Sequence, residues 1–197
     1  MSPSAYKACH DIRVVGVDDG SFGPANSRRD QQVLLVAAFL RGFRLETIEL
    51  TLIERDGLDV TQKLWPLLKN KKVDAILLSG VTFAGFNVLD VVMLARLTRR
   101  PVIVVAGRRP NNASMLFALR KHFPDWPERW RRIRQLGRPR KVVTSTEEPP
   151  LYFEAFGIAP KRSAALLRSL SITSRLPEPL RMAGLIARGL TKVNLGG

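Results

Sequence analysis

The 197-residue chain has one cysteine and two histidines, and this scarcity excludes several classes of protein. Cys9 has no cysteine to pair with, so an intrachain disulfide is impossible, which agrees with a reducing compartment. His10 and His122 lack a second ligand at suitable spacing, which argues against structural zinc. No apolar signal core begins the chain, and the most apolar helical stretch, 88–97, is too short to span a bilayer. We therefore expect a soluble, cytoplasmic protein with no membrane partner.

Acidic residues are also few, with 17 Asp and Glu against 32 Lys and Arg, a formal net charge of +15. The excess is concentrated in two segments. Residues 108–141 hold eleven basic and two acidic side chains, and residues 161–197 hold seven basic and one acidic. A polyphosphate is the natural partner of such segments, and nucleic acid is the commonest polyphosphate. Neither a GxxxxGK[ST] loop nor a GxGxxG turn is present, which disfavours an enzyme acting on a small phosphorylated metabolite.

The stretch from Arg13 to Gly20 is a short β-branched run that ends in two adjacent carboxylates and a glycine. Its valines fit a strand that is buried on both faces. Asp18 and Asp19 then lie where the strand leaves the core, and their side chains point to opposite faces. A carboxylate at this position suits Mg²⁺, which usually takes one or two carboxylates from a protein. The alternative is a simple turn, because Asp and Gly are favoured there.

The order of predicted elements gives the fold class. Apolar and alternating runs predict three successive strands with short connections, at 14–17, 33–40 and 45–53. The third alternates, with Ile48, Leu50 and Leu52 on one face. Helical and apolar runs then alternate as helix, strand, helix, strand up to residue 106, which implies parallel crossovers. Asn87 is the expected cap of the second helix. Further predicted elements are a helix over 113–121, a basic helix over 128–135, edge strands over 142–145 and 151–156, and two final helices over 160–171 and 178–189.

Three antiparallel strands followed by α-β-α-β, with C-terminal helices, is the order of the ribonuclease H-like fold. Four motifs resemble the archaeal endonuclease dU family, a branch of the endonuclease V superfamily. They are 16–20 (GVDDG), 56–61 (DGLDVT), 80–90 (GVTFAGFNVLD) and 175–181 (RLPEPLR). The likeness runs from about residue 11 to 190. We expect one α/β domain over 1–197, with a basic helical part from about 160.

The resemblance implies a Mg²⁺-dependent DNA endonuclease, with Mn²⁺ as a substitute metal, that acts in repair at deaminated bases, especially deoxyuridine. Carried over residue by residue, it makes Asp18 a metal ligand and Asp59 and Asp90 catalytic candidates. Asp19 is a further candidate metal ligand. Each has a structural alternative: a turn for Asp19, a capping-box helix start for Asp59 with Gln62, and a charge favoured by the helix dipole for Asp90.

One position departs from the endonuclease V pattern, which has a catalytic aspartate at the end of the fourth strand. Here that strand ends in Leu78-Ser79, so an uncharged hydroxyl stands near the expected carboxylate. Either another acid supplies the missing ligand, or the metal site is weakened or lost. The alternative function is therefore a nucleic-acid-binding protein that keeps the nuclease fold without its chemistry.

Basic and aromatic residues complete the predicted site. The candidate contacts to the DNA backbone are Arg108, Arg109, Arg129, Arg132, Arg181 and Arg188. Phe83 and Phe86 are candidates for stacking on an extruded base, since chemistry at a base generally requires flipping it out of the duplex. The alternatives are a solvated loop for the arginines at 108 and 109 and core packing for the phenylalanines.

Overall fold

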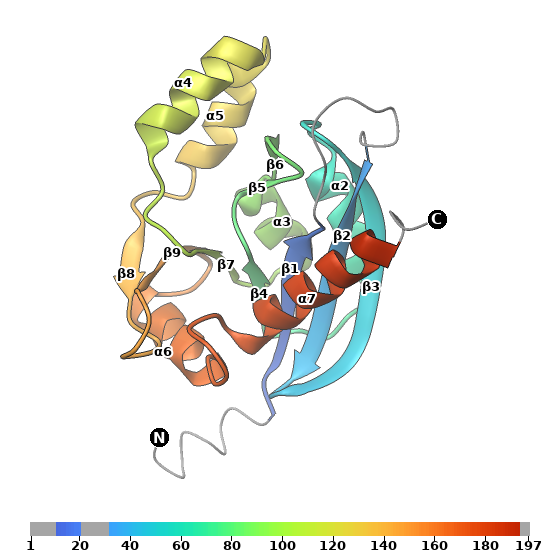
Figure 1. The fold of residues 1–197 in the computed structure, drawn as a ribbon, viewed down its shortest axis with the longest axis vertical. Coiled ribbons are helices and arrows are strands. Elements are labelled where there is room, and N and C mark those ends of the chain that lie inside the picture. Colours follow the sequence, from blue (N-terminus) through green and yellow to red (C-terminus); the bar gives the residue numbers. More distant parts are fainter. Residues whose placement is uncertain (1–10, 21–31, 194–197) are drawn as a thin grey trace.

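A computed structural model describes residues 11–20 and 32–193 (Figure 1). Cys9 and His10 lie outside the described residues. The strands are β1 (Arg13–Asp19), β2 (Gln32–Arg41), β3 (Arg44–Glu54), β4 (Ala75–Leu78), β5 (Thr82–Phe83), β6 (Asn87–Val88), β7 (Val102–Ala106), β8 (Arg140–Val142) and β9 (Leu151–Phe156). The helices are α2 (Val60–Leu68), α3 (Val91–Thr98), α4 (Asn112–His122), α5 (Trp126–Arg134), α6 (Pro160–Leu170) and α7 (Glu178–Val193).

Seven of these strands form one mixed sheet in the order β3-β2-β1-β4-β7-β9-β8. The central strand β1 pairs antiparallel with β2 and parallel with β4. β4 pairs parallel with β7, which pairs antiparallel with β9. The predicted ribonuclease H-like sheet is confirmed, including its three antiparallel strands and the parallel crossovers. A two-stranded hairpin, β5-β6, follows β4.

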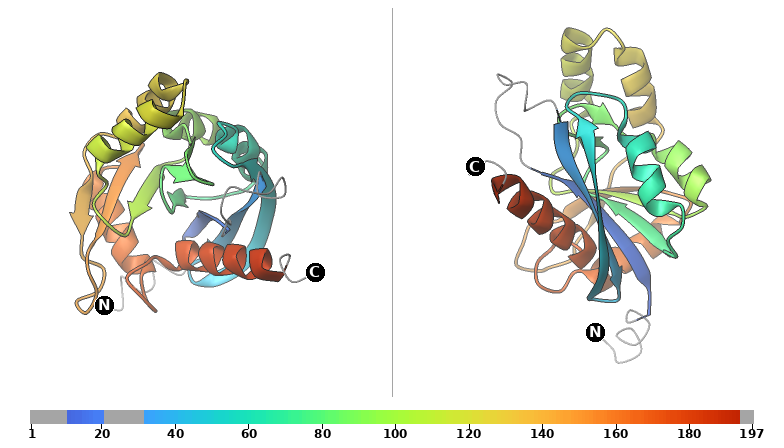
Figure 2. Two further views of the ribbon diagram at one scale, coloured as in Figure 1. Left: turned by 45° about the horizontal axis from the view of Figure 1, so that its top comes forward. Right: turned by 90° about the vertical axis from the view of Figure 1, so that its right-hand side faces the viewer.

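Helices cover both faces of the sheet (Figure 2). On one face, α2 and α3 bury Leu64 and Leu94 against Val15, Val17 and other sheet residues. On the opposite face α6 packs near β7–β9, and α7 lies across β1 and β2. Helices α4 and α5 form a hairpin that projects beyond the end of the sheet (Figure 1). Burying each large apolar side chain contributes roughly 1.5–3 kcal/mol, so these layers hold the strand ends in place.

β1 and α7 approach each other closely because of a glycine. A Cβ added at Gly16 would overlap the backbone of Pro179, next to the start of α7. The absence of a side chain lets the two backbones meet, which is one of the reasons for glycine inside a strand. This contact brings α7 to the carboxyl end of the central strand.

Two local expectations are wrong. Asn87 does not cap a helix: it lies in β6, and α3 begins after Asp90, whose carboxylate accepts a hydrogen bond from the Met93 N–H. The apolar face of β3 is largely exposed, with Leu50 and Leu52 at 46% and 48%, because α7 covers β1 and β2 and stops short of the edge strand. Within the described residues, no helix has the length and apolarity needed to span a bilayer.

Candidate functional site

The candidate site is centred on the carboxylates that end β1. Parallel pairing sets Val17 opposite Leu78, so the next residues, Asp18 and Ser79, emerge side by side. The Ser79 N–H donates to the Val17 carbonyl at 3.0 Å, and the Ser79 hydroxyl donates to Asp18 Oδ1. The Asp19 N–H donates to the same oxygen at 3.0 Å. The residue that departs from the endonuclease V pattern therefore holds the Asp18 carboxylate.

Asp18 points toward α7. A Cβ added at Gly184 would overlap Asp18 Oδ2 and would lie 3.0 Å from Arg188 Nη1. Glycine at this position allows the helix to pass beside the carboxylate, and Arg188 brings a positive charge next to it. That charge opposes the effect of burial on the pKa of Asp18. The Asp18 carboxylate therefore lies where the end of β1, the end of β4 and the helix α7 meet.

Asp19 points to the other side of the sheet, as the alternation of strand residues predicts. Its Oδ2 accepts a hydrogen bond from the Ala84 N–H at 2.6 Å. Ala84 has a positive φ of 44° and lies in the turn between β5 and β6. The hairpin therefore folds back so that one of its N–H groups meets the second carboxylate.

Burial raises the pKa of both carboxyl groups. For Asp18 the rise is opposed by the Ser79 hydroxyl, the Asp19 N–H and Arg188. For Asp19 it is opposed by the Ala84 N–H and increased by the negative charge of Asp18. Two half-buried carboxylates whose ionisation is opposed by burial form a site that favours a cation.

Asp59, a predicted catalytic residue, belongs to a separate group of polar contacts. Its carboxylate accepts hydrogen bonds from the Asn87 side chain at 2.6 Å and the Glu54 N–H at 3.2 Å. It occupies the N-cap position of α2, but its side chain makes no capping hydrogen bond, so the predicted capping box is absent. The Asn87 amide also donates to the Glu54 carbonyl at 2.8 Å and accepts from the Val60 N–H at 3.1 Å.

Arg129, a predicted DNA contact, joins the same group and is only 5% exposed. Its Nη1 donates to the carbonyls of Gly57 at 2.9 Å and Phe86 at 2.7 Å, and its Nε donates to Asp125 at 2.9 Å. The Asp56 carboxylate accepts from the Phe86 N–H at 2.8 Å. We call Asp56, Asp59, Asn87 and Arg129 the polar latch, because they tie the end of β3 to the hairpin and to α5.

Asp90, the other predicted catalytic residue, does not lie beside Asp18 in the structure. Asp90 caps α3, and its Oδ2 lies 3.6 Å from Arg131 Nη2. Arg132 also turns inward, donating to the Val88 carbonyl at 2.9 Å and to Glu128 at 2.9 Å. Across residues 11–20 and 32–193, no cluster of three or more His, Cys, Asp or Glu side chains could hold a metal ion.

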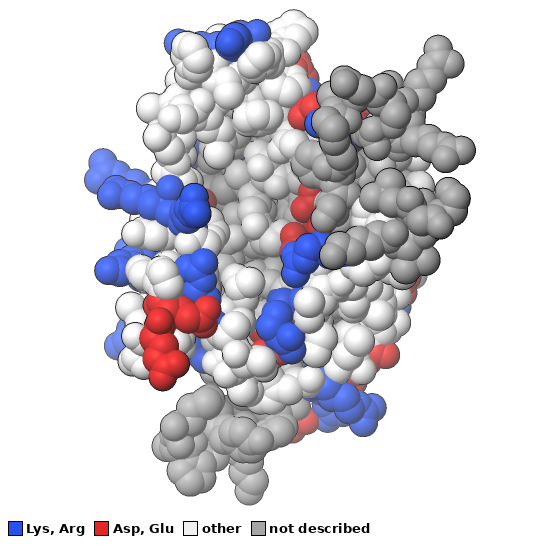
Figure 3. Space-filling model, in the orientation of Figure 1, with Lys and Arg blue, Asp and Glu red and all other residues white. Residues whose placement is uncertain are grey.

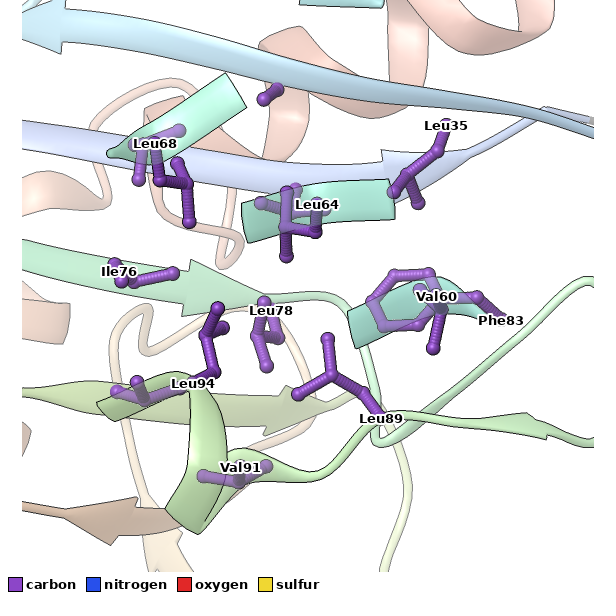
Figure 4. Packing of buried hydrophobic residues seen from close by; sticks show 14 of the residues in the cluster. Leu35, Val60, Leu64, Leu68, Ile76, Leu78, Phe83, Leu89, Val91 and Leu94 are labelled. Atoms are coloured by element: carbon purple, nitrogen blue, oxygen red, sulfur yellow. The ribbon is translucent and has the colours of Figure 1, made fainter. Parts of the chain in front are cut away.

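The two predicted stacking residues differ in position. Phe83 is 1% exposed and packs in the core near Val60 and Leu89 (Figure 4). Phe86 is half-buried and lies against Phe123, with ring centroids 5.4 Å apart. Both side chains are packed against other parts of the protein, as the alternative interpretation anticipated for at least one of them.

The remaining arginines that were predicted to contact DNA differ in exposure and in pairing. Arg108 and Arg109 follow β7 and are exposed, as is Arg188. Arg181 forms an ion pair with Glu178 at 2.7 Å. In Figure 3 basic side chains flank a hollow on this face, and acidic side chains lie beside it. The positive charge therefore reaches the neighbourhood of the site from both sides.

Sequence reasoning missed Gly184, Asn87 as part of the latch, and the inward direction of Arg129. A glycine inside a helical pattern costs about 1 kcal/mol relative to alanine, so Gly184 was a detectable signal of close packing. Nothing local identifies the latch, because its members come from three separate segments of the chain.

Comparison of the sequence with known proteins identifies the family of this chain. The family model described as endonuclease dU matches residues 10–191. A UPF0215 protein from Methanothermobacter thermautotrophicus is 38% identical over 186 residues, covering 92% of this chain and 88% of that protein. A UPF0215 protein from Methanopyrus kandleri is also 38% identical, covering 92% of each.

Solved structures show the same fold. A protein of unknown function from Archaeoglobus fulgidus has a TM-score of 0.79 at 28% identity, covering 91% of this chain and 98% of that one. Human endonuclease V has a TM-score of 0.60 at 15% identity, covering 99% and 92%. Endonuclease V from Ciona intestinalis, in complex with a 23mer DNA containing an inosine, has a TM-score of 0.59 at 14% identity, covering 97% and 95%. The chain has the endonuclease V fold and belongs to the endonuclease dU family.

Proposed function

We propose that this protein is a Mg²⁺-dependent DNA endonuclease that acts at deaminated bases, deoxyuridine above all. The observation that carries the proposal is the pair of half-buried carboxylates, Asp18 and Asp19, at the end of the central strand of an endonuclease dU family member. Ser79 orients one carboxylate and Ala84 orients the other. This is the arrangement that a hydrolytic site for a phosphodiester requires: fixed negative charge beside a positively charged surface.

The residues present fit a magnesium ion. Mg²⁺ binds oxygen and usually takes one or two carboxylates, keeping waters for its remaining positions. Asp18 would hold it through Oδ2, which accepts no hydrogen bond from the described residues, and Asp19, whose side chain leaves the other side of the strand, would add a second negative charge nearby. A divalent cation would offset the cost of their burial. When bound, such an ion supplies an activated water and stabilises the leaving oxygen.

The chain's own side chains would bind and orient the DNA strand. Arg108 and Arg109 are exposed after β7, and Arg188 lies beside Asp18, so a strand crossing the sheet edge meets positive charge on both sides. Phosphate contacts of this kind set position without reading sequence. The inosine-containing DNA bound to the Ciona endonuclease V supports DNA as the partner, because the two proteins share a fold.

A second function is a DNA-binding protein without catalysis. The observation that favours it is Ser79, a hydroxyl at the strand end where the resemblance leads us to expect a third carboxylate. In the part of the chain that the structure describes, no group of three acidic or histidine side chains takes its place. The two functions share the basic surface and differ only in whether the phosphodiester is cut.

A nicking assay on a labelled single strand with one deoxyuridine separates the two. We expect cleavage by the wild-type protein with Mg²⁺ or Mn²⁺, none with EDTA, and none of the matched deoxycytidine strand. Binding to either strand should weaken as salt rises from 50 to 200 mM, on the order of a hundredfold if several arginines meet phosphates. Salt-dependent binding without metal-dependent cleavage of any deaminated substrate would establish the binding protein instead.

A further inference from the structure

A pocket of about 350 Å³ opens beside the candidate site, at the edge where β4 and β7 end. Its volume falls within the range of roughly 300–1,000 Å³ that is usual for small-ligand sites. Ser79, which holds Asp18, lines one side, and Arg108 and Arg109 line another. Val104, Ile133 and other apolar side chains form its walls. A ligand in this pocket would therefore lie beside Ser79, which contacts Asp18, and within reach of two cations.

Glu154 is the one acidic residue that lines this pocket. It lies on β9 opposite Val104 of β7, so the two side chains share one face of the sheet. Within the described residues its carboxylate forms no hydrogen bond or ion pair, and burial raises its pKa to about 7. Burying a carboxyl group without a partner costs stability. Glu154 is half-buried with its carboxylate open to the pocket, and a ligand that donates a hydrogen bond would supply the missing partner.

We propose that this pocket receives the base extruded from the DNA strand and that Glu154 accepts a hydrogen bond from the ring N–H of a deaminated base. The proposal rests on the proposed function, because it places the base beside the phosphodiester to be cut. Arg108 and Arg109 meet the phosphates of the extruded nucleotide, and the apolar walls contact the faces of the base. Enzymes that act on a base read it in such a pocket after extrusion.

Deamination changes the hydrogen-bonding edge that Glu154 reads. Cytosine N3 and adenine N1 carry lone pairs and no hydrogen, so a carboxylate opposite either atom is repelled. Uracil N3 and hypoxanthine N1 carry a hydrogen, which an ionised carboxylate accepts. A site built for a hydrogen bond rejects analogues that cannot form it more strongly than an apolar site rejects a change of size. Thymine has the same N3–H as uracil. This contact therefore distinguishes uracil from cytosine but does not distinguish uracil from thymine.

The test measures binding without cleavage. Fluorescence anisotropy at pH 8 in EDTA compares labelled single strands that carry dU, dC or dT at one position. We expect wild-type protein to prefer dU over dC by at least about tenfold, the effect of one charged hydrogen bond. Glu154→Gln should bring this ratio close to one, because its amide also donates to cytosine N3. Glu147→Gln makes the same charge change at an exposed residue outside the pocket and should keep the ratio.

A second variant guards against misfolding. Glu154→Asp keeps the charge, shortens the side chain, and should give an intermediate ratio with a normal melting curve. A dU-to-dC ratio that is close to one in wild type, or equal in wild type and Glu154→Gln, would overturn the assignment of the pocket even if the protein cleaves DNA. A ratio that falls in Glu154→Gln supports the pocket even if cleavage is never observed, and then the nuclease proposal alone fails.

Discussion

Ala84 joins the polar latch to the carboxylate pair, Asp18 and Asp19. The two groups differ in how many of their polar atoms form hydrogen bonds. The Ala84 N–H donates to Asp19, and its carbonyl accepts from the Asp56 N–H at 2.8 Å. In the latch, Asn87 uses both its oxygen and its nitrogen, and both Asp59 oxygens accept hydrogen bonds. In the pair, each carboxylate keeps an oxygen without a hydrogen bond from the described residues.

Under the proposed function, this difference separates carboxylates that maintain the fold from carboxylates that would bind a metal ion. Buried polar groups in proteins are normally hydrogen-bonded, so the Asn87 amide and the Asp59 carboxylate, with both polar atoms of each bonded, need no further explanation. A half-buried pair with raised pKa values does, and functional sites are where such pairs gather. The predictions below substitute residues in each group. They ask whether changes in the pair affect mainly activity and changes in the latch mainly stability.

The largest expected effect is on cleavage. Asp18→Asn should lower Mg²⁺-dependent nicking of the deoxyuridine strand by more than about 100-fold, beyond the loss typical of outer-shell changes, because it removes the charge that holds the metal. Its melting temperature should stay the same or rise, because a buried charge is lost. Asp59→Asn is the matched control: it should melt earlier and keep its nicking rate per folded molecule. Equal cleavage by wild type and Asp18→Asn would place the active site elsewhere.

The second effect is on stability and concerns the latch. Asn87→Ala leaves the buried Val60 N–H without its partner and removes one hydrogen bond each from the Asp59 carboxylate and the Glu54 carbonyl; a buried group that loses its partner costs about 1–3 kcal/mol. We expect unfolding in urea to show a loss of about 3 kcal/mol. A loss below about 1 kcal/mol would mean that water replaces the amide and that the latch contributes little.

Two glycines at different points of the contact between β1 and α7 give the third comparison. Gly184→Ala should reduce nicking about tenfold or more, because the new methyl group displaces the Asp18 carboxylate, while alanine stabilises the helix interior. Gly16→Ala meets the Pro179 backbone, which cannot move aside, and should cost roughly 1–3 kcal/mol of stability. Nicking rates and urea unfolding of both variants test this. Unchanged nicking by a folded Gly184→Ala would count against the role of α7 in positioning Asp18.

The smallest effect depends on pH. The raised pKa of Glu154 means that its neutral form suits the folded protein, so this stabilisation is present at low pH and is lost as pH rises through about 7. Glu154→Gln keeps the neutral form at every pH. Thermal melts should therefore show little difference at pH 5, and at pH 8 a gain for the variant of about 2–4 °C if the effect is near 1 kcal/mol. A gain of the same size at both pH values would assign the change to packing rather than charge.

The sequence pattern was sufficient to predict the order and pairing of the first strands of the sheet, because these strands differ in their hydrophobic pattern. The buried run at 14–17, the alternating run at 45–53 and the helix–strand repeats each have a distinct period, and parallel crossovers then fix Asp18 beside Ser79. Burial on β3 was not predictable in the same way. The alternation of Ile48, Leu50 and Leu52 gives a face but does not reveal how far α7 extends over it.

The candidate site was predictable only where local sequence determines it. Asp18 and Asp19 were recognisable at a strand end. The contacts of Asp59 with Asn87 and of Asp90 with Arg131 join residues that lie far apart in sequence, so no local pattern predicts them. Glu154 stands in a run of apolar and aromatic residues at 151–156, and its alternation with Phe153 and Ala155 indicates the opposite face of the strand. What it faces depends on α4 and α5, which no local pattern relates to β9.

The contact between α7 and β1 has a consequence for the newly made chain. β1 leaves the ribosome first and α7 last, so Asp18 is synthesised long before Gly184 and Arg188 arrive beside it. Until then the β2 side chains Val36, Ala38 and Leu40 lack their helix cover, and the positive charge of Arg188 is missing from beside Asp18. The surroundings of Asp18 are therefore completed only when α7 has been made and has packed against β1 and β2.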